Sequence, residues 1–221
     1  KVSGKYSIRV TDNNSCISDT SLSTSIIVNP LPVVANITGT TSVCVGSTTA
    51  LSNATASGVW ISGTPAVATV SATGVVTAIS AGTFVISYTV VNDKGCVTTV
   101  QTLLTVNALP VVASITGTTS VCVGSTTALA NATASGVWSS ATLSVATVSA
   151  TGVVTAISAG TSVIAYTVTN ANGCVTAVST TITVNALPVV ANITGTSSIC
   201  VGATTTLSNA TASGVWSSAS P

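Results

Sequence analysis

Cysteine is the residue type in this sequence that could most readily do chemistry. The 221 residues contain six cysteines and neither histidine nor glutamate. The cysteines recur at a fixed interval: 78 residues separate Cys44, Cys122 and Cys200, as they do Cys96 and Cys174, while Cys16 precedes Cys96 by 80. A closed zinc site needs four ligands, whereas each period supplies two isolated cysteines. We therefore expect disulfides and an oxidising compartment rather than a metal site.

Charged side chains, the other carriers of chemistry, are scarce. They make up 3% of the chain, and all of them lie in its first 94 residues: Lys1, Lys5, Arg9, Asp12, Asp19, Asp93 and Lys94. General acid–base catalysis needs titratable groups, and nucleic-acid binding needs clustered lysine and arginine. We predict that the chain is not an enzyme, uses no cofactor or metal, and binds no nucleic acid.

A repeat of 78 residues organises the whole sequence. Leu-Pro pairs begin at Leu31, Leu109 and Leu187, and the text between them is nearly identical from one period to the next. This spacing predicts two complete domains, 31–108 and 109–186. The flanking segments then correspond to the back of a domain (1–30) and the front of one (187–221). We expect the sequence to be an excerpt from a longer chain that carries its export and anchoring signals elsewhere.

Each period shows the pattern of short β-strands rather than helices. Threonine and valine dominate, alternation places Ile86, Tyr88 and Val90 on one buried face, and glycine or asparagine clusters separate the runs. For the second period we predict strands at 111–117, 120–123, 126–133, 136–140, 145–149, 152–158, 161–169 and 174–185. Strands of this number and spacing, with one tryptophan after the second long strand, indicate tandem immunoglobulin-like β-sandwiches of the seven-strand Greek-key type, an all-β fold.

The mean hydropathy of +0.76 raises the question of a membrane span. The apolar residues are valine and alanine interleaved with threonine and serine, and no window reaches the roughly 18 uninterrupted apolar residues of a spanning helix. We therefore expect no membrane span in this segment.

The residues from Trp60 to Val90, and their counterparts from Trp138 to Val168, resemble the bacterial Ig-like domain of group 2. The shared features are a Trp-Ser-Ser stretch, present as Trp138-Ser139-Ser140 and as Trp60-Ile61-Ser62, and the run VATVSATGVVTAISAGT at 67–83. The flanking VCVGSTT and VNALP are similar to variants in giant surface proteins of the Bacteroidetes, including gliding-motility adhesins and cargo of the type 9 secretion system. The resemblance implies an Ig-like fold, an extracellular place on a bacterial cell surface, and the role of a stalk.

Two cysteine pairings are compatible with this organisation. The first joins Cys44 to Cys96 and Cys122 to Cys174, each pair inside one predicted domain. Strand directions alternate, however, so the turns near the two cysteines of one domain lie at opposite ends of strands about 26 Å long, whereas a disulfide needs Cα atoms within about 7 Å. The second pairing joins Cys44 to Cys174 across the junction. It leaves four cysteines to pair with domains partly outside this segment or to remain free: Cys16, Cys96, Cys122 and Cys200.

The aromatic residues could form a ligand-stacking platform or belong to the core. Their repeated position beside valine favours the core for Trp60, Trp138 and Trp216. Tyr88 and Tyr166 lie in the buried register of a strand, and we expect each hydroxyl to reach a backbone partner. Asn-x-Thr sequences occur at Asn36, Asn53, Asn131, Asn192 and Asn209. We interpret these asparagines as turn formers.

These features together favour a structural, non-catalytic segment of an extracellular adhesin stalk or surface filament, stiffened by disulfides and Leu-Pro junctions. Its partners would be neighbouring domains of the same chain and, in a fibre, like chains. A multivalent module that binds a surface glycan or a host protein is a second possibility. A spacer in a secreted polysaccharide-degrading enzyme is a third.

Overall fold

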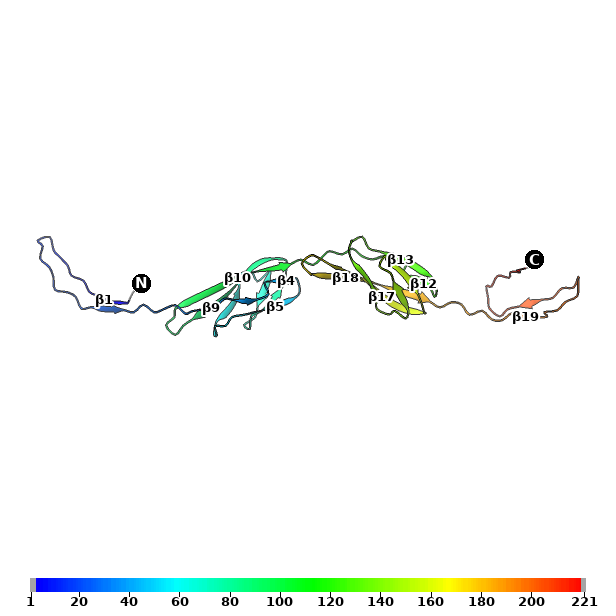
Figure 1. Ribbon diagram of the computed structural model, residues 1–221, viewed down its shortest axis with the longest axis horizontal. Helices are drawn as coiled ribbons and strands as arrows, with labels where there is room; N and C mark the ends of the chain where they lie inside the picture. Colours follow the sequence, from blue (N-terminus) through cyan, green and yellow to red (C-terminus); the bar gives the residue numbers. More distant parts are fainter. Residues whose placement is uncertain (1–2, 220–221) are drawn as a thin grey trace. The chain divides into compact units, whose positions relative to one another are not determined.

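The computed structural model describes residues 3–219, and every regular element in this range is a β-strand (Figure 1). Contacts divide the described chain into two compact units. The first contains residues 3–110 together with 170–174, and the second contains 111–169 and 175–219. The short segment 170–174 therefore groups with the first unit, although the strands on either side of it belong to the second. No helix in the described residues is long and apolar enough to cross a membrane.

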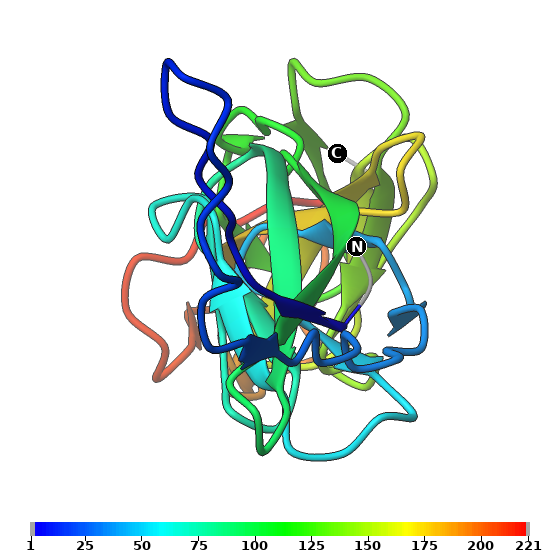
Figure 2. The same cartoon turned by 90° about the vertical axis from the view of Figure 1, so that its left-hand side faces the viewer.

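The first unit holds a sandwich of two four-stranded sheets. One sheet has the order β3 (Thr38–Gly39), β5 (Thr48–Ser52), β8 (Val75–Ala78) and β7 (Ala68–Val70). The other has the order β4 (Ser42–Cys44), β10 (Val97–Asn107), β9 (Gly82–Val91) and β6 (Val59–Ser62). All pairs are antiparallel except β4 with β10, which run parallel. The long strands β9 and β10 lie side by side over ten paired positions (Figure 2).

The second unit repeats this arrangement strand for strand. Its first sheet has the order β11 (Thr116–Gly117), β13 (Thr126–Ala130), β16 (Val153–Ala156) and β15 (Ala146–Val148). Its second has the order β12 (Ser120–Cys122), β18 (Val175–Asn185), β17 (Gly160–Thr169) and β14 (Val137–Ser140). Each of these eight strands overlaps one of the predicted ranges. The fold is a tandem array of immunoglobulin-like sandwiches, as predicted.

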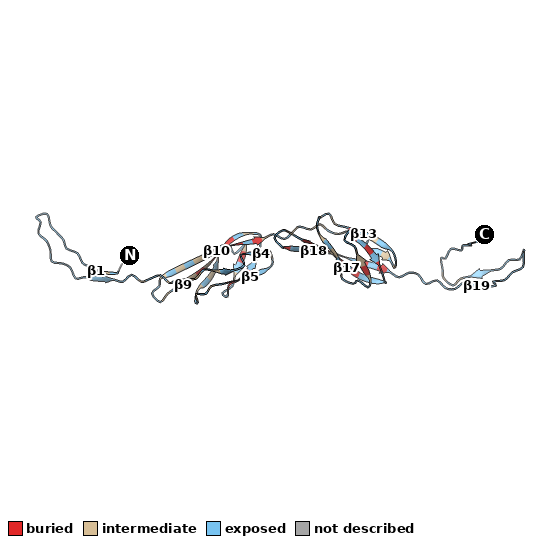
Figure 3. Cartoon of the chain, viewed as in Figure 1, coloured by how far each residue is buried: buried red, intermediate tan, exposed pale blue. Residues whose placement is uncertain are grey.

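The core of each sandwich comes from the alternation that the sequence shows. In β9, Phe84, Ile86, Tyr88 and Val90 are buried (Figure 3). Phe84 and Ile86 form one cluster with Leu104 of the neighbouring strand β10 and with apolar residues of the other sheet, among them Leu51 and Val76. The second sandwich has an equivalent core, formed by Leu129, Val154, Ile164, Ile182 and their neighbours. Each core lies within its own sandwich, so each sandwich has its own hydrophobic source of stability.

Tyrosine and tryptophan fix the loop before β6. The Tyr88 hydroxyl donates to the Thr55 carbonyl at 2.7 Å and accepts from the Gly58 amide at 2.9 Å, as expected for a buried tyrosine. The Trp60 ring lies 4.6 Å from that of Tyr88 and packs against the core while staying partly exposed. A Cβ at Gly58 would lie 2.2 Å from the Tyr88 ring, so only glycine fits there.

The second sandwich repeats this arrangement with Tyr166, Gly136 and Trp138. Tyr88 and Tyr166 are thus buried, and Trp60 and Trp138 are partly buried against the two cores.

The asparagines of three Asn-x-Thr sequences form turns. The Asn53 side-chain oxygen accepts from the Thr55 amide at 2.8 Å, and its Nδ2 donates to the Ala35 carbonyl at 2.7 Å. Asn131 and Asn209 make the equivalent bonds. For these three residues the turn-forming interpretation is correct.

The flanking segments contain only two-stranded pairings among the described residues. β1 (Gly4–Tyr6) pairs with β2 (Thr24–Ile26), and β19 (Thr194–Gly195) pairs with β20 (Leu207–Ser208). Trp216, for which the sequence predicts a place in a core, is 55% exposed among the described residues, and its core role stays a prediction. Trp60 and Trp138 stand on strands that pair with β9 and β17, whereas no described strand pairs with the residues around Trp216.

Candidate functional site: the disulfide of Cys44 and Cys174

The first half of the site is the end of strand β4. Cys44 is the last residue of β4 and lies opposite Asn107, the last residue of β10. A side-chain bond of 2.7 Å from Asn107 Nδ2 to Ser42 Oγ reinforces this short parallel pairing. The chain then turns sharply, since the Ser47 amide donates to the Cys44 carbonyl at 3.0 Å and Gly46 has a φ of 81°. Glycine adopts this left-handed conformation without strain.

The second half is the turn between β17 and β18, which is organised by one asparagine. The Asn170 side-chain oxygen accepts from the backbone amides of Asn172 and Cys174, both at 3.0 Å. Such a bond from an asparagine side chain to the amide two residues on is a common turn motif. On its other side, Asn170 Nδ2 donates to the Ala108 carbonyl at 2.9 Å. One amide group thus shapes the turn and also holds it against the segment that follows β10.

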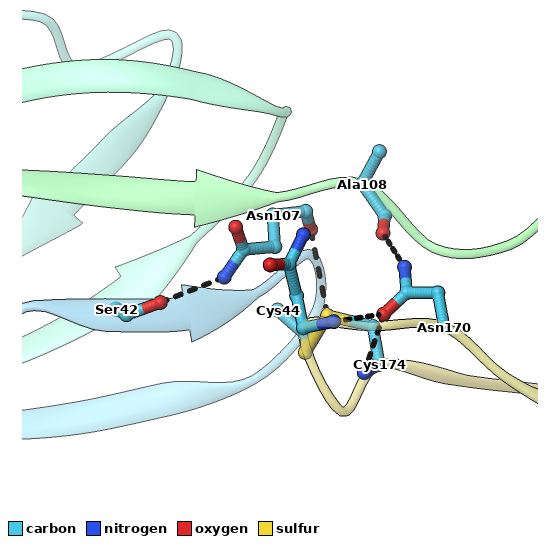
Figure 4. The surroundings of a disulfide bond; sticks show 7 residues. Ser42, Cys44, Asn107, Ala108, Asn170 and Cys174 are labelled. Carbon is cyan, nitrogen blue, oxygen red and sulfur yellow. Dashed lines mark hydrogen bonds between the residues drawn. A yellow bond between two sulfur atoms is a disulfide. The ribbon is translucent and has the colours of Figure 1, made fainter.

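The two halves meet in a disulfide between Cys44 and Cys174 (Figure 4). Their Cα atoms are 5.6 Å apart, although 130 residues separate them in the sequence. Cys174 is only 1% exposed, and its sulfur lies 3.9 Å from the Asn107 carbonyl oxygen. Because a disulfide sulfur carries no proton, this last distance is a packing contact and not a hydrogen bond.

Of the two pairings that the sequence allows, the structure therefore forms the one across the junction. The pairs Cys44 with Cys96 and Cys122 with Cys174 are absent from the described residues, and four cysteines remain free: Cys16, Cys96, Cys122 and Cys200. The reason lies in strand β10. Cys96 immediately precedes this eleven-residue strand, whereas Cys44 pairs beside its last residue. At about 3.3 Å per residue the two cysteines of one sandwich are about 35 Å apart.

The asparagines that hold the site together are absent from the site residues predicted from the sequence. Asn170 and Asn92 each stand four residues before a cysteine and make the same two kinds of bond, and Asp12 accepts from the Cys16 amide in the same way. The sequence shows this recurrence as an Asn or Asp four residues before each of three cysteines: Cys16, Cys96 and Cys174. Asn107 had no such signal, because its role depends on the pairing of β4 with β10.

The chemistry available at this site is thiol–disulfide exchange. Among residues 3–219 there is no group of three or more His, Cys, Asp or Glu side chains that could hold a metal ion. Cys44 is partly exposed and Cys174 is buried, so a reductant can approach the disulfide from the Cys44 side only.

Comparison with known proteins gives low similarity throughout. No protein-family model and no curated protein matches the chain. Domains 4 and 5 of the S-layer protein SbsC match at 18% identity with a TM-score of 0.31, over 70% of this chain and 99% of that one. The structure of SbsC domains 1–6 matches at 20% identity and a TM-score of 0.30, over 80% of this chain and 32% of that one.

The C-terminal fragment of intimin, solved with the intimin-binding domain of the translocated intimin receptor, matches at 14% identity. Its TM-score is 0.35, and the match covers 74% of this chain and 67% of that one. The immunoglobulin-like fold follows from the order and pairing of the strands in the two sheets of each sandwich.

Proposed function

We propose that this chain is a structural, non-catalytic segment of an extracellular adhesin stalk or surface filament on a bacterial cell. In this proposal the domains are residues 31–108 and 109–186, and each acts as a spacer. The observation that carries the proposal is the Cys44–Cys174 disulfide. It gives the turn between β17 and β18 a covalent attachment to β4, in addition to the backbone connection through residues 108–110.

A second covalent attachment restricts motion in a way that a linker alone does not. A single backbone connection permits rotation about its flexible dihedral angles, which number two per residue except at proline. Two attachments whose ends lie within a few ångströms permit only the rotations that both allow. Asn170, which donates to the Ala108 carbonyl, adds a third restraint on the same segment. We infer that the junction resists bending, which is the property that a stalk requires.

The disulfide supports a location outside the cell. Disulfides persist in oxidising compartments and are rare in the cytosol. The resemblance to group 2 bacterial Ig-like domains supports the same location and favours a large surface protein of the kind found in the Bacteroidetes. Each sandwich also carries its own core, so a long array of them would gain stability unit by unit.

We also propose like chains as lateral partners. The face of the sheet containing β6, β9 and β10 that points away from the core carries exposed apolar side chains, among them Val59, Ile61 and Leu103. No charged residue lies on these three strands. Exposed apolar faces without charge are prone to association, and edge strands such as β6 add unpaired backbone groups.

The stiffness proposal is tested by small-angle X-ray scattering on the whole chain. The double variant Cys44→Ser with Cys174→Ser is compared with the unchanged chain, and Cys96→Ser with Cys122→Ser serves as the matched control. We expect the first variant to need a broad ensemble of inter-domain arrangements, while the unchanged chain and the control fit a narrow one. Equal ensembles for all three proteins would contradict the proposal.

A further inference from the structure

Both halves of the disulfide site occur a second time, with their sulfur atoms unpaired. Cys122 repeats the surroundings of Cys44. It ends strand β12, lies opposite Asn185 in a parallel pairing with β18, and its carbonyl accepts from the Ser125 amide at 3.0 Å. Asn185 donates to Ser120 Oγ at 2.8 Å, as Asn107 does to Ser42. This strand end is therefore built in the same way as the one that carries a disulfide.

Cys96 repeats the surroundings of Cys174. The Asn92 side-chain oxygen accepts from the Cys96 amide at 3.0 Å, and Asn92 Nδ2 donates to the Pro30 carbonyl at 3.0 Å. The Cys96 sulfur lies 3.8 Å from the Asn29 carbonyl oxygen, against 3.9 Å for the corresponding contact of Cys174. The turn is thus already shaped, and already attached to the segment before it, without a disulfide.

The two repeats differ from the bonded site in exposure. At the turn position, Cys174 is buried whereas Cys96 is partly exposed. At the strand end, Cys44 is partly exposed whereas Cys122 is exposed. Each free sulfur therefore lacks the cover that its bonded counterpart receives. Neither can obtain it from its own sandwich, because the two cysteine positions of one sandwich are separated by an eleven-residue strand, about 35 Å in length.

We propose that Cys122 and Cys96 are the complementary halves of further disulfides of the Cys44–Cys174 type, and that the partner is another 78-residue unit of this kind in the same chain. Cys122 would bond to the turn cysteine of a unit that follows, and Cys96 to the strand-end cysteine of a unit that precedes. This inference rests on the proposed stalk function and adds a rule to it. Every unit in an array would be cross-linked at both of its ends, each time between cysteines 130 residues apart, as in the bonded pair.

The bond forms by oxidation with a disulfide of low molecular weight, such as oxidised glutathione. The thiolate of one cysteine attacks the oxidant and releases one glutathione thiol. The second cysteine then attacks the mixed disulfide and releases the other. Two protein thiols lose two protons and two electrons, and one oxidised glutathione becomes two reduced molecules.

The test extends the whole chain by one unit. A second copy of residues 109–186 is inserted after residue 186, which places a turn cysteine 130 residues beyond Cys122. The extended and the original chains are refolded in a glutathione redox buffer, and their disulfides are mapped by mass spectrometry without reduction. We expect Cys44–Cys174 in both chains, and in the extended chain a second disulfide between Cys122 and the inserted copy of Cys174. Cys96 should remain a thiol in both.

Two variants make the result decisive. Cys122→Ser in the extended chain should leave the inserted copy of Cys174 as a free thiol, with Cys44–Cys174 intact. Cys44→Ser with Cys174→Ser should leave the new disulfide in place, which separates this inference from the stiffness proposal. A disulfide between the two cysteines of the inserted unit, a free Cys122, or a disulfide-linked dimer of chains through Cys122 and Cys96 would each overturn the inference.

Discussion

The Cys44–Cys174 disulfide should make the two sandwiches unfold together rather than independently. Each sandwich has its own core, so without a cross-link each should unfold in its own transition. The perturbation that tests this is the double variant Cys44→Ser with Cys174→Ser, with Cys96→Ser and Cys122→Ser as a control that removes two cysteines but no bond.

The magnitude follows from the loops that the disulfide closes. If only the second sandwich unfolds, the first still holds Cys44 beside Asn107, so the closed loop runs from Asn107 to Cys174, over 67 residues. Closing a loop of this length disfavours the unfolded chain by about 4 kcal/mol. Unfolding of the first sandwich alone leaves Ala108 bonded to Asn170 and closes a loop of similar length, with a similar effect.

The two effects do not add when both sandwiches unfold. The closed loop then spans 130 residues and raises the free energy of the doubly unfolded state by only about 5 kcal/mol. The first unfolding step is thus made harder by about 4 kcal/mol, a factor of about a thousand in its equilibrium constant, while the second step is made harder by about 1 kcal/mol. The intact disulfide should merge two transitions into one at a higher denaturant concentration.

Tryptophan fluorescence during chemical denaturation reports each sandwich separately. In a Trp216→Phe background, Trp138→Phe leaves Trp60 as the reporter of the first sandwich, and Trp60→Phe leaves Trp138 for the second. We expect coincident midpoints with the disulfide, and separate, lower midpoints in the Cys44→Ser, Cys174→Ser variant. The reasoning fails if both reporters keep their midpoints when the disulfide is removed, or if the cysteine control moves them as much.

Three further outcomes are expected. Tyr88→Phe leaves the Thr55 carbonyl and the Gly58 amide without their partner and should lower the free energy of unfolding by about 1–3 kcal/mol, whereas Tyr6→Phe, at an exposed tyrosine, should change it little when both are measured by urea denaturation. Ile61→Lys should reduce association of chains in sedimentation velocity, and Val33→Lys, which adds the same charge away from the sheet, should not; equal effects would show that charge alone acts. In single-molecule stretching, the disulfide keeps the 130 residues between its cysteines from being extended, so its reduction should lengthen the fully stretched chain by about 450 Å, at about 3.5 Å per residue. The Cys44→Ser, Cys174→Ser variant should reach that full length without reductant.

The fold was largely predictable because its determinants are local and repeated. The alternation in β9 gives the buried face directly, and the glycines that separate the strands stand where turns occur in both sandwiches. The exposure of Trp216 is a feature that no local sequence pattern reveals. Its neighbours match those of Trp60, but burial of a tryptophan depends on a strand pairing beside it.

The disulfide was predictable only as one of two alternatives. The argument from strand direction correctly placed Cys44 and Cys96 at opposite ends of a sandwich, and the parallel pairing of β4 with the end of β10 shows why. The sequence alone does not show that the turn at 170–174 lies beside Ala108. That position depends on the hydrogen bonds of Asn170, whose side chain could equally have faced solvent.

The position of the disulfide also determines which part of the chain can extend under load. A pulling force that reaches Cys44 has two covalent routes to Cys174: the backbone, through 130 residues, and the single sulfur–sulfur bond. The shorter route becomes taut first, so the residues between the two cysteines cannot be drawn out even if their strands separate. A chain with few charges has almost no ion pairs with which to resist shear between units. In the proposed stalk, covalent bonds at the ends of the units would supply that resistance without any change to the cores.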